Sequence, residues 1–558
     1  MAVSMKKRMT VIDFFCGAGG FSEGFRKAGF EIVKGIDNWK PAIETHNLNH
    51  GLQDSVKDVL DFEDIGEINK LPDTDVIIGS PPCVLFSLSN HGGNANKELG
   101  VRLIKAFYRV IVVKKFQKGS ILKVWLMENV PNSRNYVKDS YTFSDLDLGM
   151  WAKQHHRSPD DIAIFVKNNG AILRSDDYGS GQTRKRFVCG EIIDTGEFPE
   201  PDKVDGEKIT LNKLFSNFPK PMSLVDQNRT IFDPNYPDYS ITAAQLRDHF
   251  YDTGVYEVEW QKARSAKINH PYMGRMSFPE NMNKPSRTIM ATRSASTREA
   301  ILYKSDYERV GDGEYRLPTV REAAIIMGFP ISYQFVGNDE STKWRQIGNA
   351  VCVQLSYALA RKIKEKLSVE LPEPTEVMKD LTGLHFLDTW HVKEYNKPPK
   401  RNPHALFRMH PIKSGNMTTD LSNKTRGVIG RWSVTLHFGT GEGYTSVIVN
   451  KSMQNAAEMC LRKNMPSFLK LIDKNENIKK YSDKVLNEKN KEYGFVSEDK
   501  AHPYNIVNAI SLCIRGCVEE VGDSLIDIST YQLGLTKTVV PISQIMSIYA
   551  LGIIINGK

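Results

Sequence analysis

Short apolar segments alternate with helical segments along the first part of the chain, and this alternation constrains the fold more than any other feature. The apolar segments have the length and composition of buried strands. Strands of this kind are typical of a sheet that helices cover on both faces, so we expect a doubly wound α/β fold. The predicted strands are 10–15, 31–36, 75–78 and 123–127, and the predicted helices are 21–28, 41–48 and 101–116.

The alternation ends near residue 191. From 191 to 284, proline, aspartate and asparagine become frequent, which predicts an inserted, loop-rich region. Helical patterns at 316–329 and 349–367 then predict a return to the first domain, which would comprise 1–190 and 285–370.

The remainder, 373–558, is predicted to be a separate α+β domain after the linker 371–374. It contains one predicted hairpin, with strands at 432–438 and 444–450, followed by helical segments between 452 and 490. A chain of 558 residues is expected to form two or three domains. The sequence leaves the role of this last domain open.

The composition excludes several classes of protein. No apolar run is long enough to span a membrane, and the basic segment 1–10 is followed by too short an apolar stretch for a secretory signal. Seven cysteines without paired-ligand spacing predict neither a disulfide framework nor a metal site, so we expect a cytoplasmic protein. The net charge of +8 is compatible with nucleic-acid binding but does not by itself indicate it.

A glycine-rich turn joins the first predicted strand to the first predicted helix. Its sequence, DFFCGAGGF at 13–21, lies at the strand-to-helix turn where doubly wound sheets bind ligands. Glycines there let the backbone approach a ligand closely, and the N-terminus of the following helix favours the ligand's carboxylate. Asp37 ends the next strand, at the position of an acid that holds ribose hydroxyls. A nucleotide-like cofactor, a dinucleotide and a purely structural turn all fit this pattern.

Three further motifs carry reactive or charged side chains. In GSPPC, two prolines stiffen the backbone and present Cys83 at the carboxyl edge of the sheet, which favours a nucleophile over a structural cysteine. Glu128, in ENV, ends another strand and could lie near Cys83. In QTRKRF, Arg184 and Arg186 share one face if the segment is extended. Taken alone, the glutamate and the arginines would be interpreted as capping or solvated residues.

Together and in this order, the motifs resemble those of the DNA (cytosine-5)-methyltransferase family of type II restriction–modification systems. DFFCGAGGF, GSPPC, ENV, QTRKRF and GNAV (348–351) all occur, and PSRTI (285–289) and EAAIIMGFP (322–330) also match. The resemblance spans 9–367. It implies a Rossmann-like methyltransferase domain with a mixed sheet, S-adenosyl-L-methionine as the methyl donor, no metal, and a target recognition region at 191–284.

The resemblance also implies roles in catalysis. The Cys83 thiolate would add to C6 of a cytosine flipped out of the duplex, which makes C5 able to attack the methyl group. Glu128 would hydrogen-bond the N3 edge of the base and stabilise the charge that develops in the ring. Arg184 would contact the base or its phosphate and orient Cys83, and Arg186 would support this network. No residue is identified as the base that removes the C5 proton.

In the cofactor pocket that the resemblance implies, an aromatic ring stacks on adenine and two glycines leave room for the methionine part. Two acids hold the ribose and the adenine amino group, and residues of the second and last motifs complete the pocket. In that order, these residues are Phe15; Gly17 and Gly19; Asp37 and Asp58; and Pro81 and Asn349.

Ser87 and Gln182 are the DNA contacts that the resemblance implies. Ser87 begins a loop whose run 90–100 is rich in glycine and asparagine, as expected for a closing lid. Two positions differ from residues frequent in the family: Val84 replaces a glutamine after the nucleophile, and Cys16 replaces an alanine in the first motif. Cys16 is a second thiol, but it lies in the cofactor turn.

The resulting hypothesis is a monomeric enzyme that methylates a specific double-stranded DNA sequence and protects it from a separate restriction endonuclease. A tRNA cytosine-5 methyltransferase is an alternative, against which the long variable region and the extra domain argue. The intact motif residues argue against a non-catalytic DNA-binding regulator. The Pro-Pro-Cys motif and the arginines argue against a nucleotide-dependent oxidoreductase. No convincing cluster of acids and lysines indicates a fused endonuclease in 373–558.

Overall fold

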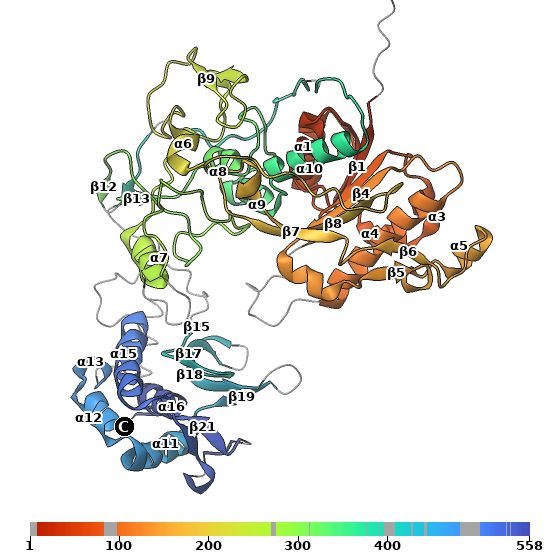
Figure 1. The fold of residues 1–558 in the computed structure, drawn as a ribbon. Helices are drawn as coiled ribbons and strands as arrows, with labels where there is room; N and C mark the ends of the chain where they lie inside the picture. Colours follow the sequence, from red (N-terminus) through yellow and green to blue (C-terminus); the bar gives the residue numbers. More distant parts are fainter. Residues whose placement is uncertain are drawn as a thin grey trace, which may run out of the picture. The chain divides into compact units, whose positions relative to one another are not determined.

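The computed structural model shows two compact units, the first ending at Tyr395 and the second beginning at Asn396 (Figure 1). The structure describes residues 8–82, 97–268, 275–311, 313–374, 376–389, 391–395, 408–425, 428–439, 444–479, 503–531, 533–535 and 537–557.

A six-stranded mixed sheet forms the centre of the first unit and confirms the predicted α/β fold. Its strand order is β2-β1-β3-β4-β8-β7. The first four strands are parallel to one another, whereas β8 runs antiparallel to β4, and β7 antiparallel to β8. The strands are β1 (Thr10–Phe14), β2 (Glu31–Ile36), β3 (Val76–Gly79), β4 (Val124–Asn129), β7 (Gly170–Arg174) and β8 (Lys185–Ile192).

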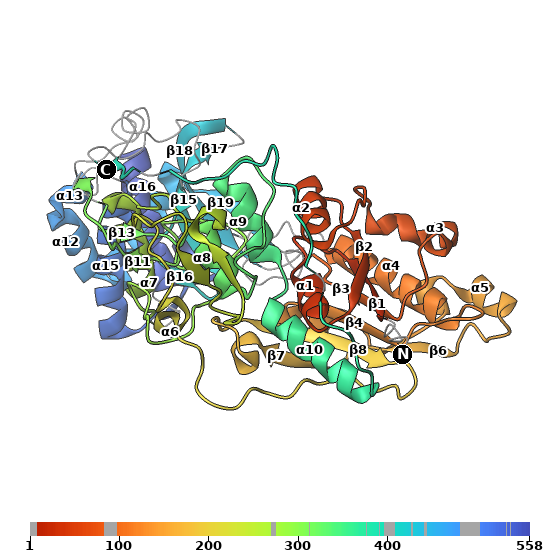
Figure 2. The same cartoon turned by 90° about the horizontal axis from the view of Figure 1, so that it is seen from above.

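Helices cover both faces of this sheet, because side chains along each strand alternate between two hydrophobic clusters. Phe14 packs with α4 (Lys97–Phe116) on one face. Val11 packs with α1 (Gly20–Lys27) and α10 (Val353–Lys366) on the other. Figures 1 and 2 show α1 and α10 side by side, although they lie near opposite ends of the unit's sequence.

The loop-rich region shares a hydrophobic core with helices that the sequence assigned to the first domain. Apolar side chains between 211 and 250 pack in one cluster with α8 (Val320–Ile326) and α9 (Glu340–Asn349). The next helix, α10, packs against the central sheet instead. The segment 285–370 is therefore divided in its packing between two cores.

Two predicted helices differ from the observed ones. The helix expected at 316–329 begins at Val320, because Thr319 and Glu322 cap each other's backbone N–H groups. Arg316, at which the helix was expected to begin, lies in β13 (Tyr315–Arg316). The helix expected at 349–367 begins at Val353, since α9 ends at Asn349.

Shorter elements complete the first unit. Its other helices are α2 (Lys40–His50), α3 (Ile65–Asn69), α5 (Gly149–Gln154), α6 (Leu211–Phe215) and α7 (Glu257–Ile268). Its small strand pairs are β5 (Ser140–Thr142) with β6 (Ile162–Phe165), β9 (Thr230–Phe232) with β10 (Ser240–Thr242), β11 (Tyr303–Lys304) with β13, and β12 (Val310–Gly311) with β14 (Glu394–Tyr395).

The boundary between the units lies later than residue 373, where the sequence analysis placed it. The Asp388 carboxylate accepts hydrogen bonds from the backbone N–H groups of His249 and Phe250, each at 3.1 Å. The backbone N–H of Lys393 donates to the buried Asp252 at 2.8 Å. These bonds tie the segment after the linker to the first unit.

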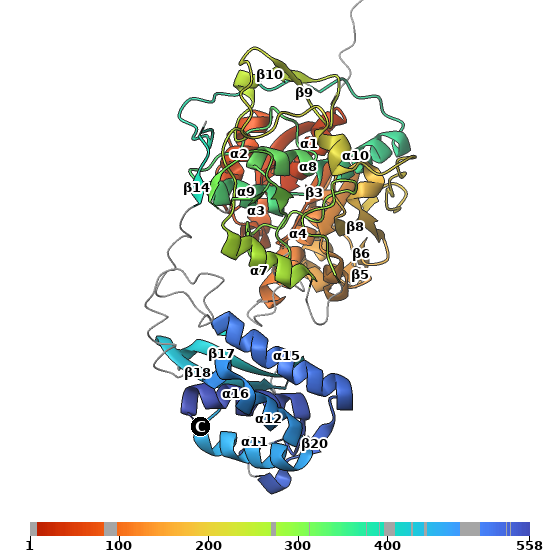
Figure 3. The same cartoon turned by 90° about the vertical axis from the view of Figure 1, so that its left-hand side faces the viewer.

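The second unit is an α+β fold in which one sheet packs against helices (Figure 3). The predicted hairpin is present as β18 and β19, but β18 also pairs with the unpredicted strand β17. The strands are β15 (Arg408–Met409), β16 (Lys413–Ser414), β17 (Met417–Thr425), β18 (Val428–Phe438), β19 (Thr445–Ile448), β20 (Leu525–Asp527) and β21 (Val539–Pro541). The helices are α11 (Lys451–Asn464), α12 (Pro466–Lys474), α13 (Glu476–Lys479), α15 (Pro503–Val521) and α16 (Ile542–Asn556).

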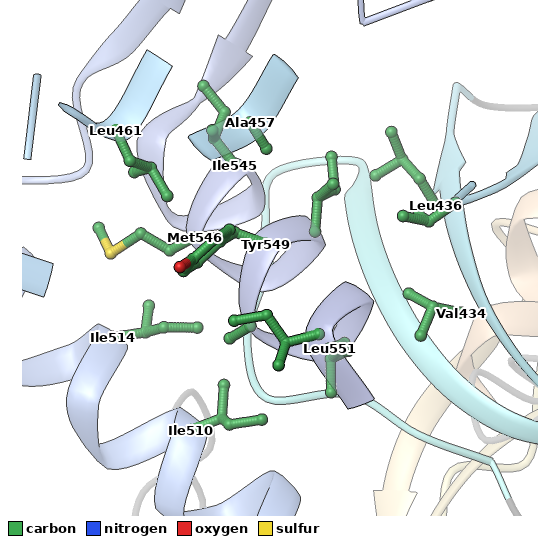
Figure 4. Packing of buried hydrophobic residues seen from close by; sticks show 14 of the residues in the cluster. Val434, Leu436, Ala457, Leu461, Ile510, Ile514, Ile545, Met546, Tyr549 and Leu551 are labelled. Atoms are coloured by element: carbon green, nitrogen blue, oxygen red, sulfur yellow. The ribbon is translucent and has the colours of Figure 1, made fainter. Parts of the chain in front are cut away.

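The central helix α16 organises the core of the second unit. It carries no charged residue and is buried along almost its whole length, as expected for a helix that is apolar on all sides. Figure 4 shows it between Val434 and Leu436 of the sheet and Ile510 and Ile514 of α15. Within the described residues, no helix combines the length and the apolar character needed to cross a bilayer.

Candidate active site

The site lies at one edge of the sheet, where the carboxyl ends of four parallel strands meet. The register pairs Phe14 with Ile36 and with Gly79, and Gly79 with Met127. The glycine turn, Asp37, the Ser-Pro-Pro segment and Glu128 therefore all leave the sheet at the same edge. Because β8 runs in the opposite direction, it starts at this edge and brings the arginine motif there.

Asp37 fixes the glycine turn through its carboxylate. It accepts hydrogen bonds from the backbone N–H groups of Gly17 at 3.0 Å and Trp39 at 2.8 Å. Burial raises the pKa of Asp37, and these hydrogen bonds partly offset the rise. Asp58 lies close by, since its carboxylate accepts a hydrogen bond from Asn38, the neighbour of Asp37, at 3.2 Å. The structure thus brings together both acids that the sequence assigned to the cofactor.

The two glycines assigned to the cofactor have different surroundings. Both have positive φ, 54° at Gly17 and 88° at Gly19, and Phe15 in the same turn also has a positive φ of 55°. A Cβ on Gly17 would have no atom nearer than 4.0 Å, so the space beside it is open. A Cβ on Gly19 would lie 2.6 Å from the Tyr333 hydroxyl and 2.8 Å from Nε2 of His50. Packing under the turn therefore excludes a side chain at Gly19.

We expect Gly19→Ala and Gly17→Ala to separate the packing role of the turn from its ligand role. Gly19→Ala combines left-handed backbone strain with two short contacts and should destabilise the first unit by about 3–5 kcal/mol. Gly17→Ala should cost only about 1–2 kcal/mol of strain, because its Cβ meets no neighbour. Thermal unfolding and calorimetric titration with S-adenosylmethionine measure both effects. Equal melting temperatures for the two variants would contradict this distinction.

The Ser-Pro-Pro segment is held between two strands. The backbone N–H of Ser80 donates to Phe14 O and its hydroxyl to Phe15 O, each at 3.0 Å. From the other side, the Asn129 side-chain amide donates to Pro81 O at 3.0 Å. Pro81 is buried. Cys83, the next residue but one, lies outside the described residues.

Asn129 is a functional candidate that the sequence analysis did not single out. It is fully buried and follows Glu128 in the ENV motif, where only the acid was given a role. Its side chain bonds to the segment that leads to Cys83 and also accepts a hydrogen bond from the backbone N–H of Val130 at 2.8 Å. Asn129 could have been identified from the sequence, because an asparagine at the end of a buried strand needs hydrogen-bond partners.

Glu128 and Arg186 form a buried ion pair at the sheet edge. Nε of Arg186 lies 2.9 Å from Oε1 of Glu128, and the two residues are only 8% and 5% exposed. Burial raises the pKa of Glu128, against the opposing effect of Arg186 and Arg184. Burial therefore favours the protonated form of this carboxyl more than in water, and a carboxyl that can donate a proton suits hydrogen bonding to a ring nitrogen.

Arg184 holds the backbone of two other motifs together. Its guanidinium donates to Ile289 O at 3.0 Å, to Gly348 O at 3.0 Å and to Ala350 O at 3.2 Å. It is 2% exposed, and these three acceptors are backbone carbonyls, whereas the resemblance implied a contact with the base or its phosphate. The arrangement instead joins the PSRTI and GNAV segments to the start of β8.

Gln182 does not lie where it could contact DNA. It is fully buried, its side-chain oxygen accepts a hydrogen bond from the backbone N–H of Ile289 at 3.2 Å, and its amide donates to the Met327 sulfur. Ser87, the second expected DNA contact, lies outside the described residues. Asn349, at the end of α9, is exposed.

The model of the C-5 cytosine-specific DNA methylase family matches residues 9–365. The chain belongs to this family. The enzyme is a DNA (cytosine-5) methyltransferase, and methyltransferases of this family use S-adenosylmethionine. The match ends within α10, so the second unit lies outside it.

Named relatives of this methyltransferase come from archaea and bacteria. Type II methyltransferase M.MthTI of Methanothermobacter thermautotrophicus is 29% identical over 377 residues, which cover 64% of this chain and 98% of that protein. Type II methyltransferase M.FnuDI of Fusobacterium nucleatum is 28% identical over 389 residues, covering 64% and 95%. Among solved structures, the methyltransferase EhMeth of Entamoeba histolytica has a TM-score of 0.40 and 15% identity, covering 65% of this chain and 99% of that chain.

The competing thiol of the methyltransferase, Cys16, is not placed as a nucleophile. It is 4% exposed, and burial raises the pKa of its thiol well above the ordinary value, with Asp37 and Asp13 adding to the effect. Cys189, on β8, is fully buried, and burial raises its pKa as well. Neither thiol ionises readily in these surroundings.

Proposed function

We propose that this methyltransferase acts on C5 of a cytosine flipped out of a specific double-stranded DNA sequence, through a covalent bond between Cys83 and C6. The observation that carries the proposal is the buried Glu128–Arg186 pair beside the segment that leads to Cys83. A flipped base placed at this edge would meet a carboxyl, a guanidinium and a thiol from three neighbouring segments. The pair is then available to the Watson–Crick edge of the base.

Each bond in the proposed reaction is accounted for. The Cys83 thiolate adds to C6, and Glu128 hydrogen-bonds N3, where negative charge develops. The carbon C5 then takes the methyl group, whose bond to the sulfonium sulfur breaks so that S-adenosylhomocysteine would leave. C5 loses its proton to a base, and the bond between C6 and sulfur breaks to release the Cys83 thiolate. Arg186 keeps Glu128 oriented, and Asn129 positions the backbone before Cys83. Arg184 acts through the backbone it supports and does not touch the base.

The turn at the end of β1 fits the S-adenosylmethionine that supplies the methyl group. The open space beside Gly17 would admit the methionine part, and the half-buried Asp37 and the neighbouring Asp58 would hold the ribose and the adenine amino group. Phe15 would stack on the adenine, and the exposed Asn349 would complete the pocket. The fit rests on the positive-φ turn and on the two acids that lie at its side.

We assign sequence recognition to the loop-rich region 191–284, whose basic side chains can contact phosphates and whose loops can enter the major groove. The biological role proposed is protection of DNA from a separate restriction endonuclease of the same specificity. The enzyme would act as a monomer.

The test is methyl transfer from labelled S-adenosylmethionine to unmethylated duplex DNA and, in parallel, to tRNA. We expect label only in DNA and only at C5 of cytosine, with the modified sites sharing one sequence. Label in tRNA alone would leave the chemistry in place but overturn the substrate. Binding of the cofactor without label in either nucleic acid would favour a regulator that has kept the fold.

A further inference from the structure

One face of the sheet in the second unit is polar and basic. Along β17 and β18, Leu421, Val434 and Leu436 point into the core with α16. The intervening residues point the other way, and we call this side the outer face. Among the residues that the structure describes, this face carries the lysine and arginine side chains Arg408, Lys413, Lys424 and Arg431, the neutral-or-charged imidazole of His437, and the acid Asp420.

A network across four strands fixes the middle of the outer face. Asp420 is 1% exposed and pairs with Arg408 and with Nε2 of His437, the latter at 3.0 Å. On the other side of the ring, Nδ1 of His437 lies 2.7 Å from the Ser446 hydroxyl and 2.9 Å from the Tyr444 hydroxyl. The buried acid thus has its partners within the network, and a buried charge requires such partners.

Several hydrogen-bond donors of the outer face, within this network and beside it, are exposed at the surface. The side chain of Arg408 is 53% exposed and Tyr444 is 54% exposed, while Lys413, Lys424 and Ser446 are also exposed. On this face the four lysine and arginine side chains that the structure describes outnumber its one described acid, Asp420. Arginine, lysine, serine and tyrosine side chains are the groups that contact phosphate oxygens and sugars in DNA complexes.

We infer that the outer face of the second unit binds the phosphate backbone of the enzyme's duplex DNA, outside the region that reads the target sequence. The chain already acts on a polyanion, and the excess of cations on this face complements it. Binding of this kind is independent of sequence. It would lengthen the time that the enzyme stays on DNA without changing the chemistry at the sheet edge of the first unit.

The test is equilibrium binding of the full-length protein to a long duplex of random sequence at several salt concentrations, followed by fluorescence anisotropy. The variant Lys413→Glu/Lys424→Glu alters the outer face, and Lys463→Glu/Lys470→Glu is the matched control on α11 and α12. We expect the outer-face variant to bind roughly tenfold more weakly and its salt slope to fall by about 1.8, that is, about 0.9 for each lost phosphate contact. The control should bind like the wild type.

Three results would contradict the inference or its choice of ligand. Unchanged binding by the outer-face variant would do so, and so would equal losses in the outer-face variant and the control, because these would reflect net charge alone. Stronger binding to an RNA of equal length would overturn the choice of DNA. If the glutamate variant does not fold, Lys413→Gln/Lys424→Gln should show a smaller change in the same direction. Methyl transfer to a short duplex is measured separately, so a failure of the proposed reaction would not be mistaken for a failure of this surface.

Discussion

Serine in place of Cys83 should lower the rate of methyl transfer by roughly 10⁴-fold or more, as the loss of a nucleophile does in other enzymes with covalent intermediates. A serine hydroxyl is not appreciably ionised at neutral pH, so it cannot add to C6 as the thiolate does. Serine in place of Cys16 should leave the rate close to that of the wild type, because Cys16 is buried and its pKa is raised. The pair of variants therefore assigns the reactive thiol.

Covalent trapping checks this assignment directly. In DNA with fluorine at C5 of the target cytosine there is no proton to remove, so the bond between enzyme and C6 persists through denaturing electrophoresis. The wild type and Cys16→Ser should form the trapped complex, and Cys83→Ser should not. A trapped complex with Cys83→Ser would mean that another side chain attacks the base.

Glutamine in place of Glu128 should lower the rate of methyl transfer by roughly 10²–10⁴-fold, the range for loss of a general acid or base. Glutamine keeps the shape of the side chain, but it cannot carry the charge or exchange a proton with N3. It also leaves Arg186 buried beside a neutral group, which should lower the free energy of unfolding by about 3–5 kcal/mol at most. Single-turnover assays with saturating cofactor isolate the effect on chemistry.

Glu191→Gln is the matched control for Glu128→Gln. Glu191 is also a buried acid of the same sheet, paired with Lys115 and accepting a hydrogen bond from Nε1 of Trp125 at 3.1 Å. It lies on β8 away from the sheet edge that holds Glu128, since it pairs with Trp125 near the start of β4. We expect it to destabilise the fold while leaving the turnover of folded protein unchanged. Equal losses of turnover in both variants would show that Glu128 acts only through stability.

The four parallel strands of the central sheet could be predicted because the apolar composition of each strand is visible in its own residues. Each of the four parallel strands is a short run of apolar residues followed by a turn, and burial on both faces requires that pattern. The strands β7 and β8 were not predicted, since β8 begins with charged residues, Lys185 and Arg186, that local propensity assigns to a solvated segment. Pairing with β4 decides its structure, and such pairing is not visible locally.

The site was predictable where a residue's role follows from its motif, and less so where the role follows from distant partners. Asp37 and Asp58 meet at the glycine turn as expected, and Glu128 meets Arg186. Arg184 and Gln182 contact backbone or side chains more than a hundred residues away, and no local pattern predicts such contacts. The same holds for Gly19, because its neighbour Tyr333 belongs to the hydrophobic cluster that α8 and α9 form with the loop-rich region.

The pairing of α1 with α10 has a consequence for how the enzyme is made. Together with α1, the helix α10 covers one face of the sheet, and it is the last element of the family's domain, so the cover of this face is incomplete until residue 366 has been synthesised. Native contacts between segments so far apart in the chain form slowly, because a long loop must close first. A growing chain therefore contains the glycine turn and Cys83 long before its catalytic domain is complete. We therefore expect a chain interrupted before α10 to be inactive and to expose apolar surface of the sheet, which would leave it open to proteolysis.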